Sequence, residues 1–409
     1  MNTLETIAGG VTAPEGFRAA GVACGIKSGD ATLDLAIVHV DADIDGGGAV
    51  PAAGVFTTNL VTAAPVIVSR EHLARSGGSA RAVIINSGCA NTCTGASGIA
   101  AARSMAADGA RQFGCDASEI LIASTGVIGV DLDAAKIASG IADSATALRR
   151  EAHLDAARAI MTTDAGPKEA AVQILTPGGT FRVGGMATGA GMIEPNMATM
   201  LAVLTTDARV DAPRLRPALA DAVRDTFNAI TVDGECSTND TVFALASGAS
   251  GVEIDDARLP DLVEALTAVA RRLAIDIVRG GEGATKLVAI RVHDAGTADD
   301  ARRAAHTLAN SLLVKTAVHG GDPNWGRLVA AAGRAGVAFD PARATVRIGD
   351  VVMFEQGRPF DERAPAAAEH LRGPEIDIHV GLGTGAQEAT VWTCDLSAEY
   401  VRINSEYRT

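Results

Sequence analysis

Short apolar runs rich in β-branched residues alternate with glycine-rich turns in the N-terminal part of the chain. Such runs are typical of strands buried in a sheet. One longer segment, residues 98–114, places Ala and Met on one face and charged residues on the other, which predicts an amphipathic helix. The predicted strands cover residues 33–42, 52–59, 64–69, 81–88 and 119–129, the last running into a glycine turn.

The same alternation continues to the C-terminus, so the pattern predicts an α/β or α+β protein. The clearest break is the loop containing Gly and Pro just before Thr199. Further helices are predicted over residues 133–146, 149–162, 212–228, 258–277 and 298–316. Further strands are predicted over residues 197–208, 344–354 and 375–383.

Composition and charge exclude several functional classes. The 409 residues are 47% hydrophobic and 21% charged, which is typical of a globular protein with a large core. Aromatic residues are only 3% and the net charge is −14, which disfavours both base stacking and binding to a phosphate backbone. No apolar window of about 18 residues lacks Gly or charge, and the N-terminus does not resemble a secretory signal. We therefore expect a cytoplasmic protein.

The cysteines and histidines suggest neither a metal site nor a histidine base. The six cysteines are scattered through the chain, which favours free thiols over disulfides. Cys89 and Cys93 are four residues apart, but no second pair completes a zinc site. No histidine lies in a glycine-rich segment typical of catalysis, so a Ser-His-Asp or Cys-His mechanism has no evident base. We expect no metal and no cofactor.

Thr199 stands near the start of an almost wholly apolar run. Such a threonine usually has a structural role, because Thr favours strands and its hydroxyl can satisfy a turn. The functional alternative is an N-terminal nucleophile. Its hydroxyl attacks the carbonyl carbon of Ala198, the resulting ester hydrolyses, and the new α-amine serves as the base. An α-amine titrates at about pH 7.7–8.0, near working pH, so no histidine is required.

Motifs along the whole chain resemble the ornithine acetyltransferases, the bifunctional glutamate N-acetyltransferase family of arginine biosynthesis. The matches run in order from Thr12 to Thr409, and no single motif carries the resemblance. They are GVFTTN, INSGCANTCTG, STGVIG, IMTTDAGPK, GMIEPNMATMLAVLTTDA, NAITVDGECSTNDTV, GEGATK, LVKTAVHGGDPNWGR and YVRINSEYRT.

The resemblance implies a fold and a set of site residues. The implied fold is DmpA-like and ornithine-acetyltransferase-like, with mixed sheets sandwiched by helices. Self-cleavage between Ala198 and Thr199 would give an α chain, residues 1–198, and a β chain, residues 199–409. Thr199 matches the nucleophile, and Thr125 and Gly126 match the pair that stabilises the oxyanion. Matching substrate contacts are Glu282, Asn404 and Thr409.

Several positions depart from the family pattern within the substrate pocket. Thr188 stands where the family has a substrate-binding Lys, and Ala190 replaces a Ser. Ala165 replaces a substrate-binding Thr, and Gly280–Gly281 precede Glu282. The nucleophile and the oxyanion pair are kept, so the hypothesis is unchanged acyl-transfer chemistry with an altered pocket. Alternatively, a nearby cation such as Lys168 or Lys286 replaces the missing Lys.

The implied activity is ping-pong acyl transfer from an N-acetyl amino acid such as N-acetylornithine to an amine such as glutamate. The implied partners are small amino-acid or N-acyl amino-acid substrates and the protein's own α and β chains in an α2β2 assembly, with neither nucleic acid nor membrane. Three alternatives stay open. The first is a paralogue of specialised metabolism with another donor or acceptor. The second is an N-acyl hydrolase that passes the acyl group to water. The third, from a different class, is an uncleaved and catalytically silent binding protein.

Overall fold

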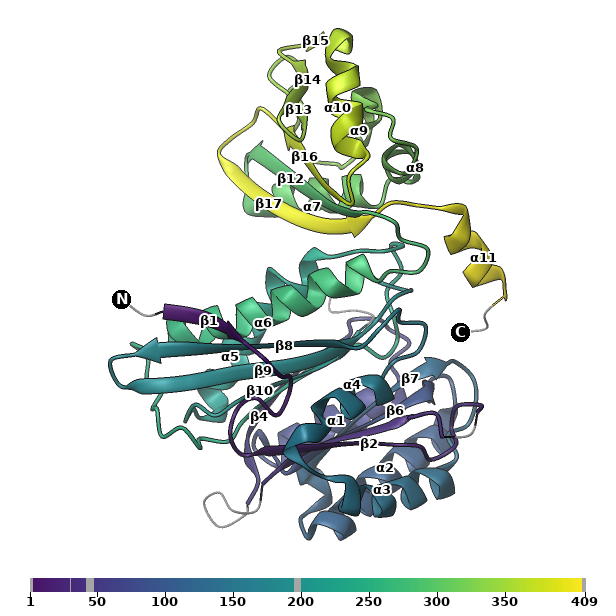
Figure 1. The fold of residues 1–409 in the computed structure, drawn as a ribbon, viewed down its shortest axis with the longest axis vertical. Coiled ribbons are helices and arrows are strands. Elements are labelled where there is room, and N and C mark those ends of the chain that lie inside the picture. Colours follow the sequence, from purple (N-terminus) through teal and green to yellow (C-terminus); the bar gives the residue numbers. More distant parts are fainter. Residues whose placement is uncertain (1–2, 30, 42–47, 195–199, 407–409) are drawn as a thin grey trace. The chain divides into compact units, whose positions relative to one another are not determined.

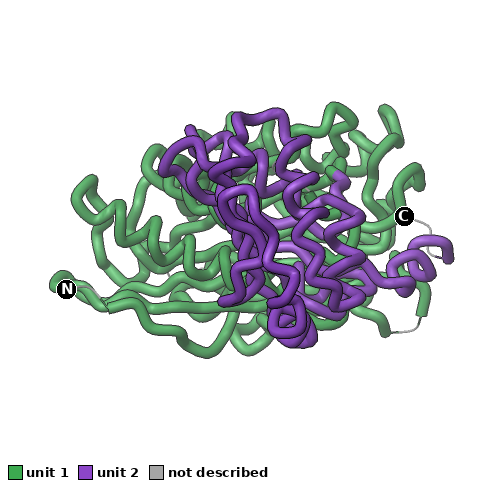
Figure 2. The backbone as a smooth tube through the Cα atoms, turned by 90° about the horizontal axis from the view of Figure 1, so that it is seen from above, with its two compact units in different colours: residues 1–228, 236–277, 409 green, residues 229–235, 278–408 purple. Residues whose placement is uncertain are grey.

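The computed structural model describes residues 3–29, 31–41, 48–194 and 200–406, and divides into two compact units. Unit 1 comprises residues 1–228, 236–277 and 409, and unit 2 comprises residues 229–235 and 278–408 (Figure 2). The loop before Thr199, together with Ala198, Thr199 and Thr409, falls partly or wholly outside the described residues. The predicted division into α and β chains at residue 198 stays a prediction.

Unit 1 contains two mixed sheets (Figure 1). Among the described strands of the larger sheet, only β10 (Leu201–Thr206) and β11 (Thr241–Ala246) run parallel to each other. Among those of the smaller sheet, only β6 (Ala82–Cys89) and β7 (Ile120–Val127) do. The larger sheet has the order β1 (Thr3–Ile7), β8 (Lys168–Thr176), β9 (Gly179–Thr188), β10 (Leu201–Thr206), β11 (Thr241–Ala246), β4 (Val50–Phe56), β5 (Ser79–Ala80). The smaller sheet has the order β2 (Phe17–Val22), β3 (Leu35–Val40), β6 (Ala82–Cys89), β7 (Ile120–Val127).

Helices cover the outer faces of these two sheets, while the inner faces share one apolar core with residues 156–160. That core contains Phe17 and Leu121 from the smaller sheet and Leu201 and Phe243 from the larger one. The helices of this unit are α1 (Ala64–Arg75), α2 (Gly95–Phe113), α3 (Ala134–Ala147), α4 (His153–Ala159), α5 (Ala212–Arg224) and α6 (Leu259–Arg279). Mixed sheets sandwiched by helices confirm the predicted fold class.

Strand β10 shows why the predicted apolar run folds as it does. All six of its residues are buried, because both faces of the sheet are covered. Leu201 and Val203 point into the core between the sheets. Leu204 lies on the opposite face, next to Gly185 and to Val269 of α6. The uninterrupted hydrophobic pattern is therefore the pattern of a central strand.

Unit 2 is a single sheet with helices packed against one face. Its strands have the order β15 (Arg358–Pro359), β14 (Val351–Glu355), β13 (Thr345–Ile348), β16 (Glu375–Gly381), β12 (Leu287–Ala295), β17 (Gln387–Cys394). Its helices are α7 (Ala298–Ala309), α8 (Leu312–Gly320), α9 (Trp325–Gly333), α10 (Ala364–Leu371) and α11 (Ala398–Glu406). The predicted strand over residues 344–354 is a hairpin, β13 and β14, that turns at Gly349 with φ of 56°.

Two sequence predictions of secondary structure are wrong. Residues 64–69, predicted as a strand, form the start of helix α1. Pro65 suits the first turn of a helix, and the helix continues to Arg75, beyond the apolar run. The single helix predicted over residues 298–316 is two helices. Asn310 ends α7, and the Ser311 hydroxyl accepts the Val314 N–H to begin α8.

Neither metal ligands nor membrane helices are found in the described part of the chain. No helix there combines the length and apolar character needed to cross a bilayer. No three His, Cys, Asp or Glu side chains there come together as a possible metal site. All six cysteines are free thiols, as predicted.

The core between the sheets gives a direct test of the fold. Phe243 is fully buried, and its ring meets that of Phe56 edge-on at 5.9 Å between centroids. We expect Phe243→Ala to lower the free energy of unfolding by about 3–5 kcal/mol, since it leaves a cavity. Leu175→Ala, at a position 39% exposed in β8, should cost far less. Urea unfolding followed by circular dichroism compares the two variants, and equal losses would contradict the assignment of this core.

Candidate active site

A small pocket lies in unit 1 where several strands of the two sheets end or begin. Thr125 comes from the end of β7, Thr188 from the end of β9, and Leu201 from the start of β10. The cavity measures about 40 Å³. Its other lining residues are Thr162, Gly189, Ala190, Gly191, Met200, Ser237, Asn239 and Asp240. Met200, a lining residue, is buried and directly follows Thr199 in the sequence.

Thr125 and Gly126 are held in register by the parallel pairing of β6 and β7. Gly126 pairs with Gly88 and has a φ of 125°, a conformation that favours glycine. A Cβ at Gly126 would lie 2.7 Å from the Cys89 nitrogen. Steric constraint alone therefore requires glycine at this position, whatever its role in catalysis.

The buried side chain of Asn239 connects this strand end to its neighbours. Its amide nitrogen donates to the carbonyls of Ala90, at 2.7 Å, and Ser124, at 2.8 Å. Its amide oxygen accepts the hydroxyls of Thr92 and Thr238, each at 2.6 Å. Because Ser124 directly precedes Thr125, these bonds fix the strand that carries Thr125.

Asp164 organises the opposite side of the pocket. Its side chain is fully buried and forms an ion pair with Lys168. It also accepts the Thr188 hydroxyl at 2.6 Å and the backbone N–H groups of Gly189 and Thr162, each at 2.9 Å. One carboxylate thus joins the start of β8 to the glycine-rich loop that leads toward Thr199.

The charge of Asp164 is maintained despite its burial. Desolvation acts to raise the pKa of this carboxyl, but the Lys168 ammonium and the hydrogen bonds from Thr188 and Gly189 outweigh it. The pKa of Asp164 therefore lies below the ordinary value for aspartate. The side chain of Lys168 is 5% exposed and its ammonium is paired with Asp164; Lys168 is not among the residues that line the pocket.

Unit 2 brings together Glu282 and Asn404, two of the predicted substrate contacts. The Asn404 amide donates to Glu282 Oε2 at 2.8 Å, and Glu282 is buried. The Ser397 hydroxyl donates to the Gly283 carbonyl at 2.6 Å, just before α11 begins. The side-chain amide of Asn404, on helix α11, therefore contacts the loop of the GEGATK motif.

Asp395 fixes the other end of that loop. It accepts the Thr285 N–H at 2.8 Å and hydroxyl at 2.5 Å, and His319 Nδ1 lies 2.7 Å from it. Burial acts to raise the pKa of Asp395, but these hydrogen bonds lower it below the ordinary value. Lys286 donates to the carbonyls of Val318 and Leu371, each at 2.7 Å. Its ammonium is therefore already engaged within unit 2.

The structure brings some of the predicted site residues together and leaves others apart or outside the described residues. Thr125, Thr188 and Ala190 line one pocket, with Gly126 adjacent to Thr125. Ala165 is exposed and does not line it; its near neighbour Thr162 does. Ala198, Thr199 and Thr409 lie outside the described residues. Sequence reasoning missed the roles of Thr162, Asp164 and Asn239, although all three lie within motifs that carry the family resemblance.

The fold and the pocket define an α/β protein with a small, hydroxyl-lined site at strand ends. A model of the ArgJ family matches residues 18–409. The arginine biosynthesis bifunctional protein ArgJ of Symbiobacterium thermophilum is 48% identical, over 99% of this chain and 100% of its own. The chain belongs to the ArgJ family. This confirms the predicted family of acetyltransferases in arginine biosynthesis.

Two solved structures are also similar in part. The arginine biosynthesis bifunctional protein ArgJ of Bacillus halodurans is 37% identical, with a TM-score of 0.48, over 50% of this chain and 97% of that one. The ornithine acetyltransferase of Mycobacterium tuberculosis, solved in complex with ornithine, is 40% identical, with a TM-score of 0.42, over 48% of this chain and 99% of that one.

Asp164→Asn tests the central role of the buried carboxylate. It leaves the Lys168 ammonium buried without a negative partner, which we expect to cost about 3–5 kcal/mol of stability. The double variant Asp164→Asn with Lys168→Met removes both charges and should recover part of that loss. Urea unfolding of the three proteins measures the difference. If the double variant were no more stable than the single one, the ion pair would not be the reason for the loss.

Proposed function

We propose that the chain transfers an acetyl group from N-acetylornithine to glutamate, with Thr199 as the nucleophile after cleavage at Ala198–Thr199. The observation that supports this most directly is the pocket between β7, β9 and β10. Thr125 lines it from one side, and Met200, the residue after Thr199, lines it from another.

The reaction proceeds in two balanced halves. The Thr199 hydroxyl attacks the acetyl carbonyl carbon and gives its proton to the α-amine of the same residue. The C–N bond of the donor breaks, the leaving amine takes that proton, and an acetyl ester remains on Thr199. The amine of glutamate then attacks the ester and regenerates the hydroxyl. Thr125 and Gly126 stabilise the oxyanion of both tetrahedral intermediates.

The size of the pocket supports a short acyl chain. A water molecule needs about 10–15 Å³ of such a cavity, so about 40 Å³ holds only a few atoms of that size. An acetyl group meets this limit, whereas a long acyl chain exceeds it. Glu282 and Asn404 are the residues we assign to the amine end of the substrate, with Thr409 as a further contact. The α2β2 assembly and the cytoplasmic location remain predictions from the family resemblance.

Intact mass measured after denaturation tests the nucleophile. We expect two fragments, residues 1–198 and 199–409, and a gain of one acetyl group on the second after brief incubation with N-acetylornithine. Added glutamate should remove that acetyl group as N-acetylglutamate. Loss of the acetyl group to water in the absence of any acceptor, at the same rate, would identify a hydrolase instead.

Two variants separate cleavage from catalysis. Thr199→Ala should remain a single chain. Thr125→Ala should lower kcat by about 10²–10³-fold through the loss of one oxyanion donor. A wild-type chain that stays uncut would contradict the proposal and favour the catalytically silent binding protein.

A second candidate function is acyl transfer on a substrate without a carboxylate at the position of Thr188. The structure favours it through one observation: the described residues lining the pocket include no Lys or Arg, and Asp240 is the charged residue among them. The Thr188 hydroxyl is used by Asp164, and the ammonium groups of Lys168 and Lys286 are engaged elsewhere. None of these groups is left to pair with a substrate carboxylate.

Thr188→Lys distinguishes the two candidates. A hydrogen bond to a charged group contributes about 1.5–3 kcal/mol, or roughly 10- to 150-fold in affinity. If the pocket lacks a carboxylate partner, the wild-type chain should discriminate little between N-acetylornithine and N-acetylputrescine, which lacks the carboxylate. Thr188→Lys should then favour N-acetylornithine by that factor in kcat/KM, and Thr188→Val should not. Strong discrimination by the wild-type chain would exclude the second candidate.

A further inference from the structure

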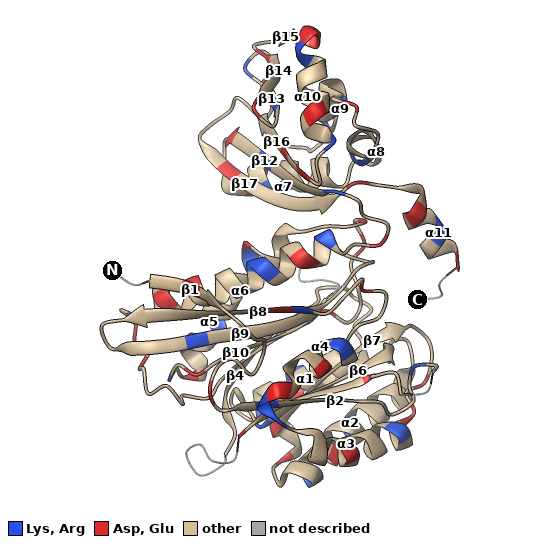
Figure 3. Ribbon diagram, viewed as in Figure 1, with Lys and Arg blue, Asp and Glu red and all other residues tan. Residues whose placement is uncertain are grey.

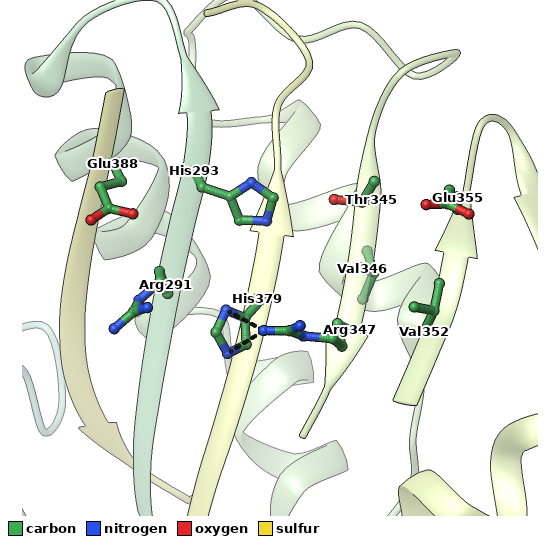
Figure 4. Close-up of a pocket in the computed structure, with 9 residues that line it drawn as sticks. All are labelled: Arg291, His293, Thr345, Val346, Arg347, Val352, Glu355, His379 and Glu388. Atoms are coloured by element: carbon green, nitrogen blue, oxygen red, sulfur yellow. Dashed lines mark hydrogen bonds between the residues drawn. The ribbon is translucent and has the colours of Figure 1, made fainter. Parts of the chain in front are cut away.

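A hollow of about 370 Å³ lies on the sheet of unit 2, on strands that carry none of the predicted site residues (Figure 4). Two arginines and two histidines contribute to its lining: Arg291 and His293 from β12, Arg347 from β13, and His379 from β16. The helices of the unit pack on the other face of the sheet, where Ile290, Val292 and Val380 are buried. Alternation along each strand therefore directs the charged residues to this face.

Register places three of these side chains in one row across neighbouring strands. Arg291 is paired with His379 across β12 and β16, and His379 with Arg347 across β16 and β13. Neighbouring strands are about 4.8 Å apart, so the two arginine backbones are separated by roughly 10 Å with the histidine between them. Such a row concentrates positive charge, and like charges side by side on a sheet are destabilising.

Neither arginine is neutralised by a carboxylate in the described residues. No ion pair is found there for Arg291 or Arg347, whereas some other arginines of this acidic chain have one, as Arg279 does with Glu375 (charged residues are coloured in Figure 3). Arg347 is instead directed at the ring of His379, with its Nη2 atom 3.3 Å from each ring nitrogen. Figure 4 shows this guanidinium beside the imidazole, with Arg291 on the other side of the ring.

We propose that this hollow binds a small anionic metabolite, whose carboxylate or phosphate group lies between the guanidinium groups of Arg291 and Arg347. Arginine is suited to this role because its planar fork of N–H donors matches both anions. His293 and Thr345 offer further polar atoms beside the row. Glu355 and Glu388 stand at the two margins of the hollow, on β14 and β17, and limit the positive field to its centre.

The surroundings of His379 make the binding dependent on pH. Burial lowers its pKa, and Arg347, Arg291 and His293 lower it further, while Asp377 on the same strand acts in the opposite direction. A bound anion offsets the neighbouring positive charge and favours the protonated ring. Affinity should therefore rise as the pH falls below the ordinary histidine pKa of about 6.5, because the pKa of the free ring lies below that value and the bound anion favours the protonated ring.

Calorimetric titration of the full chain with succinate and with inorganic phosphate tests the proposal at constant ionic strength. We expect saturable binding of at least one of them, and the one that binds identifies the anionic group. Arg291→Gln and Arg347→Gln should each weaken that binding about tenfold or more. Arg358→Gln, at an exposed arginine of β15 outside the hollow, is the matched control and should leave the affinity unchanged.

A second readout follows the histidine directly. The His379 ring proton should shift in the NMR spectrum on anion binding, and His379→Gln should abolish the part of the pH dependence that exceeds the titration of the anion itself, while leaving binding near pH 8 in place. The absence of saturable binding of both anions would overturn the proposal, as would an equal loss in Arg358→Gln. A change in sedimentation caused by Arg347→Gln without any anion binding would instead identify the face as a contact between copies of the chain.

Discussion

The arrangement of the candidate active site depends on one buried carboxylate. Asp164 is removed from water and is stabilised by the Lys168 ammonium together with donors from Thr162, Thr188 and Gly189. An unpaired charge at this depth would be too costly to keep. The start of β8 with Lys168, the loop with Thr162 and the segment with Thr188 and Gly189 must therefore all be in place before the carboxylate has its full set of partners. This makes folding of the pocket cooperative.

The same constraint gives Thr188 a structural role. A threonine there completes the shell around Asp164 and adds no charge of its own. In the proposed function, recognition of the substrate at this position and the internal stability of the loop would be coupled through one residue. The proposed acyl-transfer chemistry would not share this coupling, because Thr125 is positioned from the other side by Asn239 and by the pairing of β6 with β7. The specificity of such a site can change while its chemistry is preserved.

Much of the fold was predictable from hydrophobic periodicity, and the exceptions have physical reasons. The central strand β10 was evident because all its residues are buried. Helix α1 was predicted as a strand because a short apolar run does not distinguish the two, and only Pro65 indicated a helix start. The hairpin of β8 and β9 went unpredicted, since its glycines and polar residues obscure the alternation.

The candidate site was less predictable than the fold. The motifs identified Thr125 and Thr188, but the function of Asp164 depends on contacts with residues 24 and 25 positions away, which no local pattern encodes. Asn239 likewise acts on segments more than a hundred residues distant. The charged row on unit 2 arises only when three strands are aligned in register.

The order of strands in the larger sheet has a consequence for how the chain folds before and after the proposed cut. β9 precedes the proposed cut and β10 follows it, yet the two pair along Val183–Thr188 and Leu201–Thr206. β11 similarly pairs with β4. A cut between them leaves the ladder intact but ends the covalent link that holds the partners at a high effective concentration. If the chain is cut there, it folds as a single polymer only before the cut, and after denaturation the two fragments would have to find each other again.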